Sequence, residues 1–414
     1  MARVQNISSV SSEIQRKDDD PSLKEVLRYP MLMLKICGIY VEWQGDQVRL
    51  TGAMAAKLIL NVMCMLILVF IVIRISASFV TNDDFSDKLM GRIVFAVMYI
   101  SNTVMFPVFL ATTTTNLPKI LSKFSLFQTE YGFATDMRKL KRMTSNIFFM
   151  HFVFTLISGI CINALASYRI LDESGLLIGR LLPFSYKDGY IFDLVYIIDM
   201  SATQFCSIFI ESETLISFVV SHIIIKEFQE VIRKVDVARE GDTISTIELQ
   251  NLRQQHHKVT ELLQTANSVI QLNMFFGFMV LLPSLCFTVY GIVYSTLGIF
   301  DILFLVTIFL MQLLGMVSMI ATGAKINSKA HGVLRSLFAL SLDDLSVETQ
   351  QQLNMFIAQL SSQTIGINVY GLFTMDGSTF LTIFGTVITY TIVVLQIHAG
   401  SCNVTQVNNC NCTT

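Results

Sequence analysis

Seven long hydrophobic runs alternate with charged segments along this chain of 414 residues. About 20 apolar residues in a helix cross the hydrocarbon of a bilayer, and most of the runs reach that length. The first run is short, and we expect the stems of Lys57 and Arg74 to lengthen it while their charges snorkel to the interface. The predicted membrane-spanning helices lie within residues 58–73, 93–118, 144–168, 191–221, 262–300, 302–324 and 377–397.

In the last run, polar side chains recur on one side of the predicted helix. The positions on that side, spaced by three and four residues, are Thr379, Thr382, Thr386, Thr389, Val393 and Gln396. Such spacing forms one stripe on an α-helix. A stripe of hydroxyl and amide groups inside a membrane needs a polar neighbour. It therefore favours the lining of a water-filled pore, with helix–helix packing through threonine and glycine as the alternative.

The long segments after spans four and six also have helical patterns. A seam with coiled-coil-like spacing contains Leu249, Leu252, His256, Val259, Leu263, Ala266 and Ile270. It favours helical extensions that assemble subunits; the alternative is packing within one subunit. At His256, a hydrogen-bonded histidine is favoured over a metal ligand. After span six, Leu353, Phe356 and Leu360 predict an amphipathic helix, with Ser346 as its N-cap.

The distribution of Lys and Arg orients the predicted helices. A cytoplasmic N-terminus leaves only six of the 29 Lys and Arg residues on the outer side, which is what the positive-inside rule favours. These six are Arg74, Lys88, Arg92, Arg169, Arg180 and Lys187. Seven spans then place the C-terminus outside the cell, where Asn403 and Asn411 are predicted glycosylation sites because each begins an Asn-x-Thr sequon. This orientation is opposite to that of G-protein-coupled receptors.

These spans and their orientation divide the chain into seven predicted regions. They are a cytoplasmic N-terminal segment (1–54), transmembrane helices one to four (55–221), a cytoplasmic helical extension (222–271), transmembrane helices five and six (272–322), cytoplasmic anchor helices (323–376), the pore-lining helix (377–397) and an extracellular tail (398–414). The whole is an all-α membrane protein whose cytoplasmic helices form an assembly region.

Composition agrees with a membrane protein and excludes several functions. Hydrophobic residues make up 53% of the chain and charged residues only 14%, while the formal net charge of −2 gives no indication of nucleic-acid binding. Zinc-ligand spacings, glycine-rich phosphate loops and nucleophile motifs do not stand out from chance. We therefore expect no enzyme activity, cofactor or metal.

A small-molecule site is predicted in the outer halves of the spans. Polar residues inside a membrane are costly, so they mark functional positions, although interhelical hydrogen bonding is the alternative for each one. The residues predicted to line the site are Tyr99, Asn102, Asn163, Tyr196, Asp199, Thr203, Tyr290, Tyr294, Phe304 and Thr307. An apolar cleft with a few such groups is typical of small-molecule binding.

The end of the last run resembles the signature of insect gustatory receptors. The segment from Thr389-Tyr390 to Gln396-Ile397 is similar to their Thr-Tyr, five hydrophobic residues and Gln-Phe. The chain differs in Thr391, which replaces a hydrophobic residue, and in Ile397, which replaces Phe. The preceding Tyr370–Phe373 and Met375-Asp376 also resemble this family, and its length and topology fit nearly the whole chain.

The resemblance implies a ligand-gated, non-selective cation channel in the plasma membrane of sensory neurons. Four subunits, identical or of related receptors, would surround a pore lined by the seventh helices, with a tastant site in each outer helix bundle. Gln396 and Ile397 would match the pore constriction, and the related odorant-receptor co-receptor implies Val393 as a hydrophobic gate. Permeating cations, membrane lipids and a small tastant are the expected partners.

Two other functions remain open from the sequence. One is a seven-span receptor that signals through a cytoplasmic partner without conducting ions. The other is a transporter, although transporters more often have internal repeats and broken helices in matched positions. Current through the protein would separate the channel from both.

Overall fold

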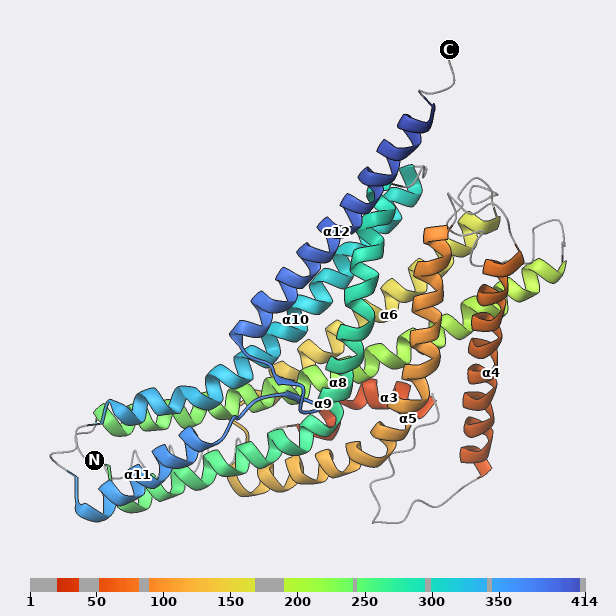
Figure 1. The fold of residues 1–414 in the computed structure, drawn as a ribbon. Coiled ribbons are helices and arrows are strands. Elements are labelled where there is room, and N and C mark those ends of the chain that lie inside the picture. The colour runs from red at the N-terminus through yellow and green to blue at the C-terminus, as the bar shows by residue number, and fades with distance from the viewer. Residues whose placement is uncertain are drawn as a thin grey trace.

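The computed structural model describes residues 21–36, 52–81, 89–167, 190–240, 244–294, 299–340 and 345–409. Seven long helices account for most of them (Figure 1). They are α4 (Gly52–Thr81), α5 (Leu89–Tyr131), α6 (Met137–Ser167), α8 (Tyr190–Glu240), α9 (Thr246–Tyr294), α10 (Ile299–Phe338) and α12 (Gly377–Asn409). Each of these helices carries one predicted span, although the fifth, 262–300, runs past the end of α9 at Tyr294. The all-α fold with seven membrane helices is confirmed.

Shorter elements complete the described fold. Near the N-terminus lie α2 (Leu23–Val26) and α3 (Arg28–Ile36), and α11 (Val347–Ser362) precedes a hairpin of β1 (Asn368–Val369) and β2 (Phe373–Thr374). The hairpin pairs Asn368 with Thr374 and Val369 with Phe373 in antiparallel register. Ser346 caps α11 as predicted, because its Oγ accepts a hydrogen bond from the backbone N–H of Thr349 at 3.2 Å.

Four helices within the described residues are long and apolar enough to cross a membrane by length and composition alone. These stretches are Ile59–Ala77, Ile197–Arg239, Thr246–Val289 and Leu305–Phe338, and α12 contributes a shorter apolar stretch, Gly377–Val393. α8 has 51 residues, so it is roughly 75 Å long at 1.5 Å per residue. A hydrocarbon layer of about 30 Å therefore holds only part of it.

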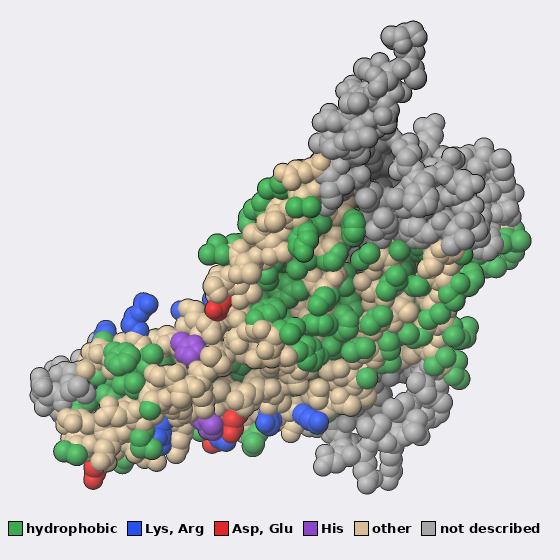
Figure 2. Space-filling model, viewed as in Figure 1, with side chains coloured by type: hydrophobic (Ala, Val, Ile, Leu, Met, Phe, Trp, Pro, Cys, Tyr) green, Lys and Arg blue, Asp and Glu red, His purple; other side chains and the backbone are tan. Residues whose placement is uncertain are grey.

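We call residues 222–271 and 323–376, which are the predicted cytoplasmic segments, the extension. Figure 1 shows α8, α9 and α10 continuing together out of the bundle to meet α11. Charged residues reappear on α8 from Lys226 onward. Figure 2 shows the same division on the surface, where hydrophobic side chains cover the bundle and charged ones gather on the extension. Glu227 and His256 therefore lie outside the predicted membrane-spanning segments.

The predicted seam on α9 is buried inside the extension of this one chain. All seven of its side chains, from Leu249 to Ile270, are at most 5% exposed. His256 lies between the rings of Phe228 on α8 and Phe356 on α11, with ring centroids 5.2 and 5.6 Å away. Its Nε2 is 3.1 Å from the Ala330 carbonyl oxygen on α10, and burial lowers its pKa to about 4. Helices of the same chain fill this seam, which is the alternative of packing within one subunit. Assembly through the extension stays a prediction.

The final helix also differs from its predicted length. α12 continues to Asn409, twelve residues beyond the predicted end at Ile397. Hydropathy marks where the apolar run stops, and no proline follows to stop the helix itself. The predicted glycosylation site Asn403 lies on this last part of α12, and Asn411 lies outside the described residues.

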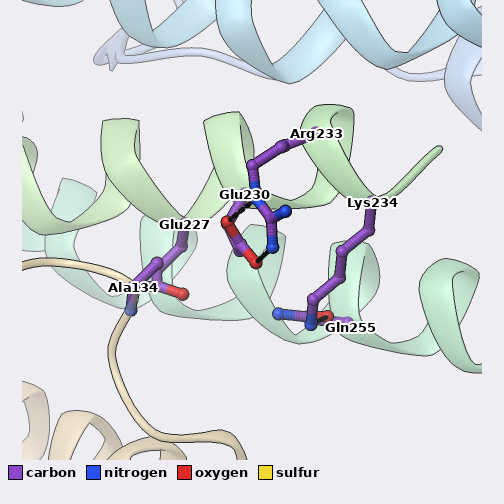
Figure 3. Close-up of polar contacts among 6 residues, drawn as sticks. All are labelled: Ala134, Glu227, Glu230, Arg233, Lys234 and Gln255. Atoms are coloured by element: carbon purple, nitrogen blue, oxygen red, sulfur yellow. Dashed lines mark hydrogen bonds and ion pairs between the residues drawn. The ribbon is translucent and has the colours of Figure 1, made fainter. Parts of the chain in front are cut away.

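A buried acid ties α8 to the loop between α5 and α6. α5 ends where Gly132 takes a left-handed conformation (φ 69°), and the loop that follows reaches Glu227. Figure 3 shows Glu227 pointing from α8 toward Ala134, whose backbone N–H donates to its Oε1 at 2.7 Å. The Glu227 side chain is fully buried, and burial raises its pKa to about 7. Nearby, Arg233 pairs with Glu230, and Lys234 donates to Gln255 of α9.

We predict that Glu227→Gln removes a pH dependence of stability. The folded-state pKa of about 7 lies above the ordinary 4.5, so the folded protein binds the extra proton between these values. The free energy of unfolding should therefore fall by up to about 3 kcal/mol as pH rises from 4.5 to 7. Above pH 7 it should stay level. Thermal unfolding of the purified protein across this range should show a flatter profile for Glu227→Gln, together with a higher melting temperature at pH 7.5.

Glu230→Gln is the matched control for this prediction. Glu230 lies one turn away on α8, and its bond to the exposed Arg233 side chain lowers its pKa. Its charge adds to the Glu227 shift, but burial is the largest cause, so its replacement should keep most of the slope between pH 4.5 and 7. Parallel profiles for Glu227→Gln and the wild type would show that Glu227 does not titrate in this window.

Candidate pore helix and ligand site

α12 begins at a strong N-cap. Oδ1 of Asp376 accepts from the Thr379 backbone N–H at 2.9 Å, from the Thr379 hydroxyl at 2.9 Å and from the Ser378 hydroxyl at 2.7 Å. These hydrogen bonds lower the pKa of Asp376 to about 2. A carboxylate that accepts the free N–H groups of the first turn also complements the helix dipole. The cap therefore fixes where α12 starts.

The hairpin before this cap fixes the start of α12 to two other helices. Tyr370 (φ 50°) and Gly371 (φ 75°) form the tight turn between β1 and β2, a conformation that glycine adopts freely. Nδ2 of Asn267 on α9 donates to the Asn368 carbonyl at 3.0 Å. Nδ2 of Asn327 on α10 donates to the Ile365 carbonyl at 2.9 Å, so α9 and α10 both hold the segment that leads into α12.

One face of α12 packs on its own subunit, and the threonine stripe does not. Ile383 is 9% exposed, and Phe380 and Val387 pack beside it against the core. α12 contacts α9 and α10, and it runs along the edge of the bundle beside α10 (Figure 1). At 3.6 residues per turn, the predicted pore residues lie about a third of a turn around the helix from this packed face. Of these residues, Thr382, Thr389, Val393 and Gln396 are exposed and Thr386 is half-buried, while the Ile397 side chain lies outside the described part.

The stripe threonines point acceptor oxygens outward. Their hydroxyls donate to carbonyls one turn earlier on the same helix: Thr382 to Ser378 at 3.1 Å, Thr386 to Thr382 at 2.8 Å and Thr389 to Gly385 at 2.8 Å. A hydroxyl has one proton and two lone pairs, so each oxygen keeps accepting capacity after this bond forms. Such a surface suits a cation or water better than an anion.

A third face of α12 is apolar and equally exposed. It carries Leu381, Ile388 and Ile392, which are 73%, 46% and 47% exposed. Side chains of this kind face lipid in a membrane protein at no cost. The helix thus has one face for its own bundle, one for hydrocarbon and one that needs water or another polar group.

Two predicted ligand residues, Tyr99 and Asp199, meet in a buried cluster. The Tyr99 hydroxyl on α5 donates to Asp199 Oδ2 on α8 at 3.3 Å. Arg74 on α4 lies 3.9 Å from Asp199 Oδ1, and both charged side chains are at most 2% exposed. Three helices therefore share one polar cluster inside the bundle. A cavity of about 280 Å³ between α4 and α8 borders Arg74 and Asp199, and its other lining residues are apolar.

Arg74 is the residue that the sequence pattern placed wrongly. Its position at the end of the first hydrophobic run predicted a snorkelling side chain, whereas the structure turns it inward because Asp199 offers a partner of opposite charge. A basic and an acidic residue at matching depths on two spans would have been the signal. Such pairs are expected inside bundles, where neither charge tolerates hydrocarbon alone.

Of the remaining eight predicted ligand residues, only Asn102 and Thr307 have described side chains, and neither lies in the cluster of Tyr99 and Asp199. Asn102 is half-buried on α5, and Thr307 is exposed on α10 with its hydroxyl bonded to the Leu303 carbonyl. The other six are Asn163, Tyr196, Thr203, Tyr290, Tyr294 and Phe304, whose side chains lie outside the described part.

Known proteins share both sequence family and fold with this chain. The family described as 7tm chemosensory receptor matches residues 35–399. A structure of the olfactory receptor OR5 from the insect Machilis hrabei in complex with eugenol has 14% identity and a TM-score of 0.62, covering 91% of this chain and 98% of that one. A second structure of that receptor has 13% identity and a TM-score of 0.63, with the same coverage. No curated protein sequence matches.

We predict that Asp199→Asn destabilises the bundle. It leaves the Arg74 charge buried without its ionic partner, which typically costs about 3–5 kcal/mol. The double variant Arg74→Met/Asp199→Asn removes both charges and keeps an acceptor for Tyr99, so it should recover most of the loss. Thermal unfolding of the purified variants measures both effects. A single variant as stable as the wild type, or a double variant no better than the single one, would contradict a stabilising ion pair.

Proposed function

Because this chain belongs to the 7tm chemosensory receptor family, within the insect chemoreceptor superfamily, we propose that it is a ligand-gated, non-selective cation channel with a gustatory role. The observation that most supports conduction is the exposure of the threonine stripe on α12. The stripe faces neither its own bundle nor the apolar side of the helix. In a membrane, copies of this chain around a common axis would give the stripe its polar neighbour, which is a water-filled pore.

Apolar side chains on the extension support assembly of several copies. Val347 and Ile247 are 73% and 72% exposed, and Phe338 and Met355 are 67% and 54% exposed. Because the extension lies outside the hydrocarbon, lipid does not cover these side chains. Exposed apolar surface of this kind marks protein–protein contacts. We propose that the extension joins four subunits through this surface, while the seam around His256 holds each subunit together.

The pore would be closed by apolar side chains and opened by moving them aside. Rings of Val393 and Ile397 exclude water from a narrow axis and so block ions without a charged barrier. When the helices separate, threonine oxygens and the Gln396 amide replace part of the hydration shell of a cation. These groups carry no fixed charge, so they discriminate poorly among cations. This is the physical basis for a non-selective pore.

A small, largely apolar molecule is the proposed ligand. The related olfactory receptor OR5 is known in complex with eugenol, a small phenol. Here the predicted site lies around Tyr99, Asn102 and Asp199 in the half of the bundle away from the extension. A bound molecule that changes how α5 and α8 pack would act on α9 and α10, which contact them and hold α12. The tastant, the plasma-membrane location and the sensory cell belong to the same proposed role.

We predict that Val393→Ala raises the current that flows without ligand. A smaller side chain widens the apolar ring and admits water, so basal conductance should rise several-fold. Ile388→Ala is the matched control, because Ile388 is similarly exposed (46% against 43%) but lies on the apolar face. Whole-cell recording with surface labelling of both variants makes the measurement. Equal basal currents in the two variants would place the gate elsewhere.

We predict that Gln396→Glu changes which cations permeate. A ring of carboxylates favours divalent ions, so reversal potentials should show a higher permeability of Ca²⁺ relative to Na⁺. Recording in the Val393→Ala background removes the need for a known ligand. Gln396→Asn, which keeps an uncharged amide, should leave the permeability ratio near that of the parent. Surface-expressed proteins that conduct in none of these forms would favour a non-conducting receptor or a transporter.

A further inference from the structure

Three lysines on three helices contribute positive charge at His222, near the predicted boundary between bundle and extension. Lys139 on α6, Lys226 on α8 and Lys325 on α10 are exposed, and the charge of each acts on the half-buried His222 ring. None of these lysines forms an ion pair with a described residue. One acid lies beside them, Asp136, whose Oδ1 accepts a hydrogen bond from the Lys139 backbone N–H at 2.9 Å. Three lysines against one acid leave a net positive field that attracts an anion. We call Lys139, Lys226, Lys325 and His222 the basic cluster.

An apolar groove of about 320 Å³ lies on the same three helices. Its lining includes Phe148 and Phe152 of α6, Leu215 and Phe218 of α8, and Ser318 of α10. Phe218 also stacks on His222, with ring centroids 6.3 Å apart. The groove therefore borders the basic cluster directly.

On all three helices, the lysine of the basic cluster lies toward the extension from the groove residues. On α8, Phe218, His222 and Lys226 are spaced by four residues and share one face. On α10, Lys325 lies two turns beyond Ser318, toward the extension. On α6, Lys139 lies two turns before the groove residue Ile147, which is again toward the extension. Each helix thus carries apolar groove residues inside the membrane and a lysine at its boundary.

We propose that the groove and the basic cluster bind one anionic phospholipid of the leaflet nearest the extension. Its phosphorylated headgroup would lie on Lys139, Lys226 and Lys325, and an acyl chain would lie along Phe148, Phe152 and Phe218. The lysines are at the depth where lipid phosphates lie, because the charged part of α8 begins at Lys226. Lysine binds phosphate as a point charge, and each lysine near an anionic surface contributes about 1 kcal/mol.

The charge pattern favours a lipid over the other possible occupants. A second copy of this chain would need an acidic face at the same level to neutralise three lysines. A soluble phosphate compound has no apolar part, so it would leave the groove unfilled. The groove contains one acid, Glu211, which lies eleven residues before His222, or about 16 Å along α8. That distance places it beside the acyl chain and away from the headgroup.

Binding of a fluorescent phosphatidylinositol bisphosphate with long acyl chains tests this site. The purified full-length chain in neutral detergent is titrated, and probe anisotropy is followed. The variant Lys139→Gln/Lys226→Gln/Lys325→Gln should bind the probe roughly a hundredfold more weakly, since three lysines are lost. The matched control Lys119→Gln/Lys123→Gln/Lys258→Gln also removes three exposed lysines and should keep wild-type affinity. Thermal unfolding confirms that both variants are folded.

A second variant separates a lipid from a free headgroup. Thr214 lines the groove and is exposed, so Thr214→Trp fills the space without disturbing a buried contact. It should weaken binding of the long-chain probe at least tenfold. Free inositol trisphosphate should compete poorly with the probe for the wild-type protein.

Four outcomes would overturn the lipid site. The first is equal affinity of the two lysine variants, and the second is equal binding of a phosphatidylcholine probe. The third is full competition by inositol trisphosphate with no effect of Thr214→Trp. The fourth is a lysine variant that changes only the oligomer size. The first two indicate lipid contact without specificity. The third indicates a site for a soluble phosphate, and the fourth an interface between copies.

Discussion

A polar side chain within hydrocarbon must find a polar partner, and this constraint organises the molecule. Arg74 and Asp199 meet it by pairing inside the bundle, with Tyr99 as a further donor. The hydroxyl protons of the threonines on α12 are donated to carbonyls of the same helix. The remaining lone pairs of these hydroxyls have no partner among the described residues of the bundle. The first case closes the bundle on itself. The second leaves a surface that is complete only with water or another subunit.

The extension, predicted to lie outside the hydrocarbon, follows the opposite constraint. Apolar residues are buried there around His256, whose contacts with α8, α10 and α11 join four helices of one chain. A neutral imidazole fits this position, since burial lowers its pKa to about 4. The chain therefore has a buried core within the extension. The exposed apolar residues at the outer surface of the extension remain available for contacts between subunits.

The sequence predicted what depends on local periodicity and missed what depends on distant pairing. Spacing alone placed the spans, the threonine stripe, the buried seam on α9 and the cap at Ser346. It could not say that helices of the same chain fill the seam, because periodicity identifies an apolar face and not its partner. Nor could it pair Arg74 with Asp199, which lie 125 residues apart in the sequence. The part of α12 beyond Ile397 was missed because hydropathy and helicity end for different reasons.

The hairpin before α12 connects these two environments mechanically. α9 and α10 are continuous helices that run from the core of the extension through the bundle. Asn267 of α9 and Asn327 of α10 hydrogen-bond to the backbone just before α12. Asp376 caps the first turn of α12 through its hydrogen bonds to Ser378 and Thr379. A shift of α10 relative to α9 would thus strain a short, tightly bonded segment and tilt α12 with it. Since Phe380, Ile383 and Val387 pack on the same bundle, such a tilt would carry the threonine stripe as a unit. In the proposed channel, the two asparagines and the capped turn would therefore link repacking of the bundle directly to α12.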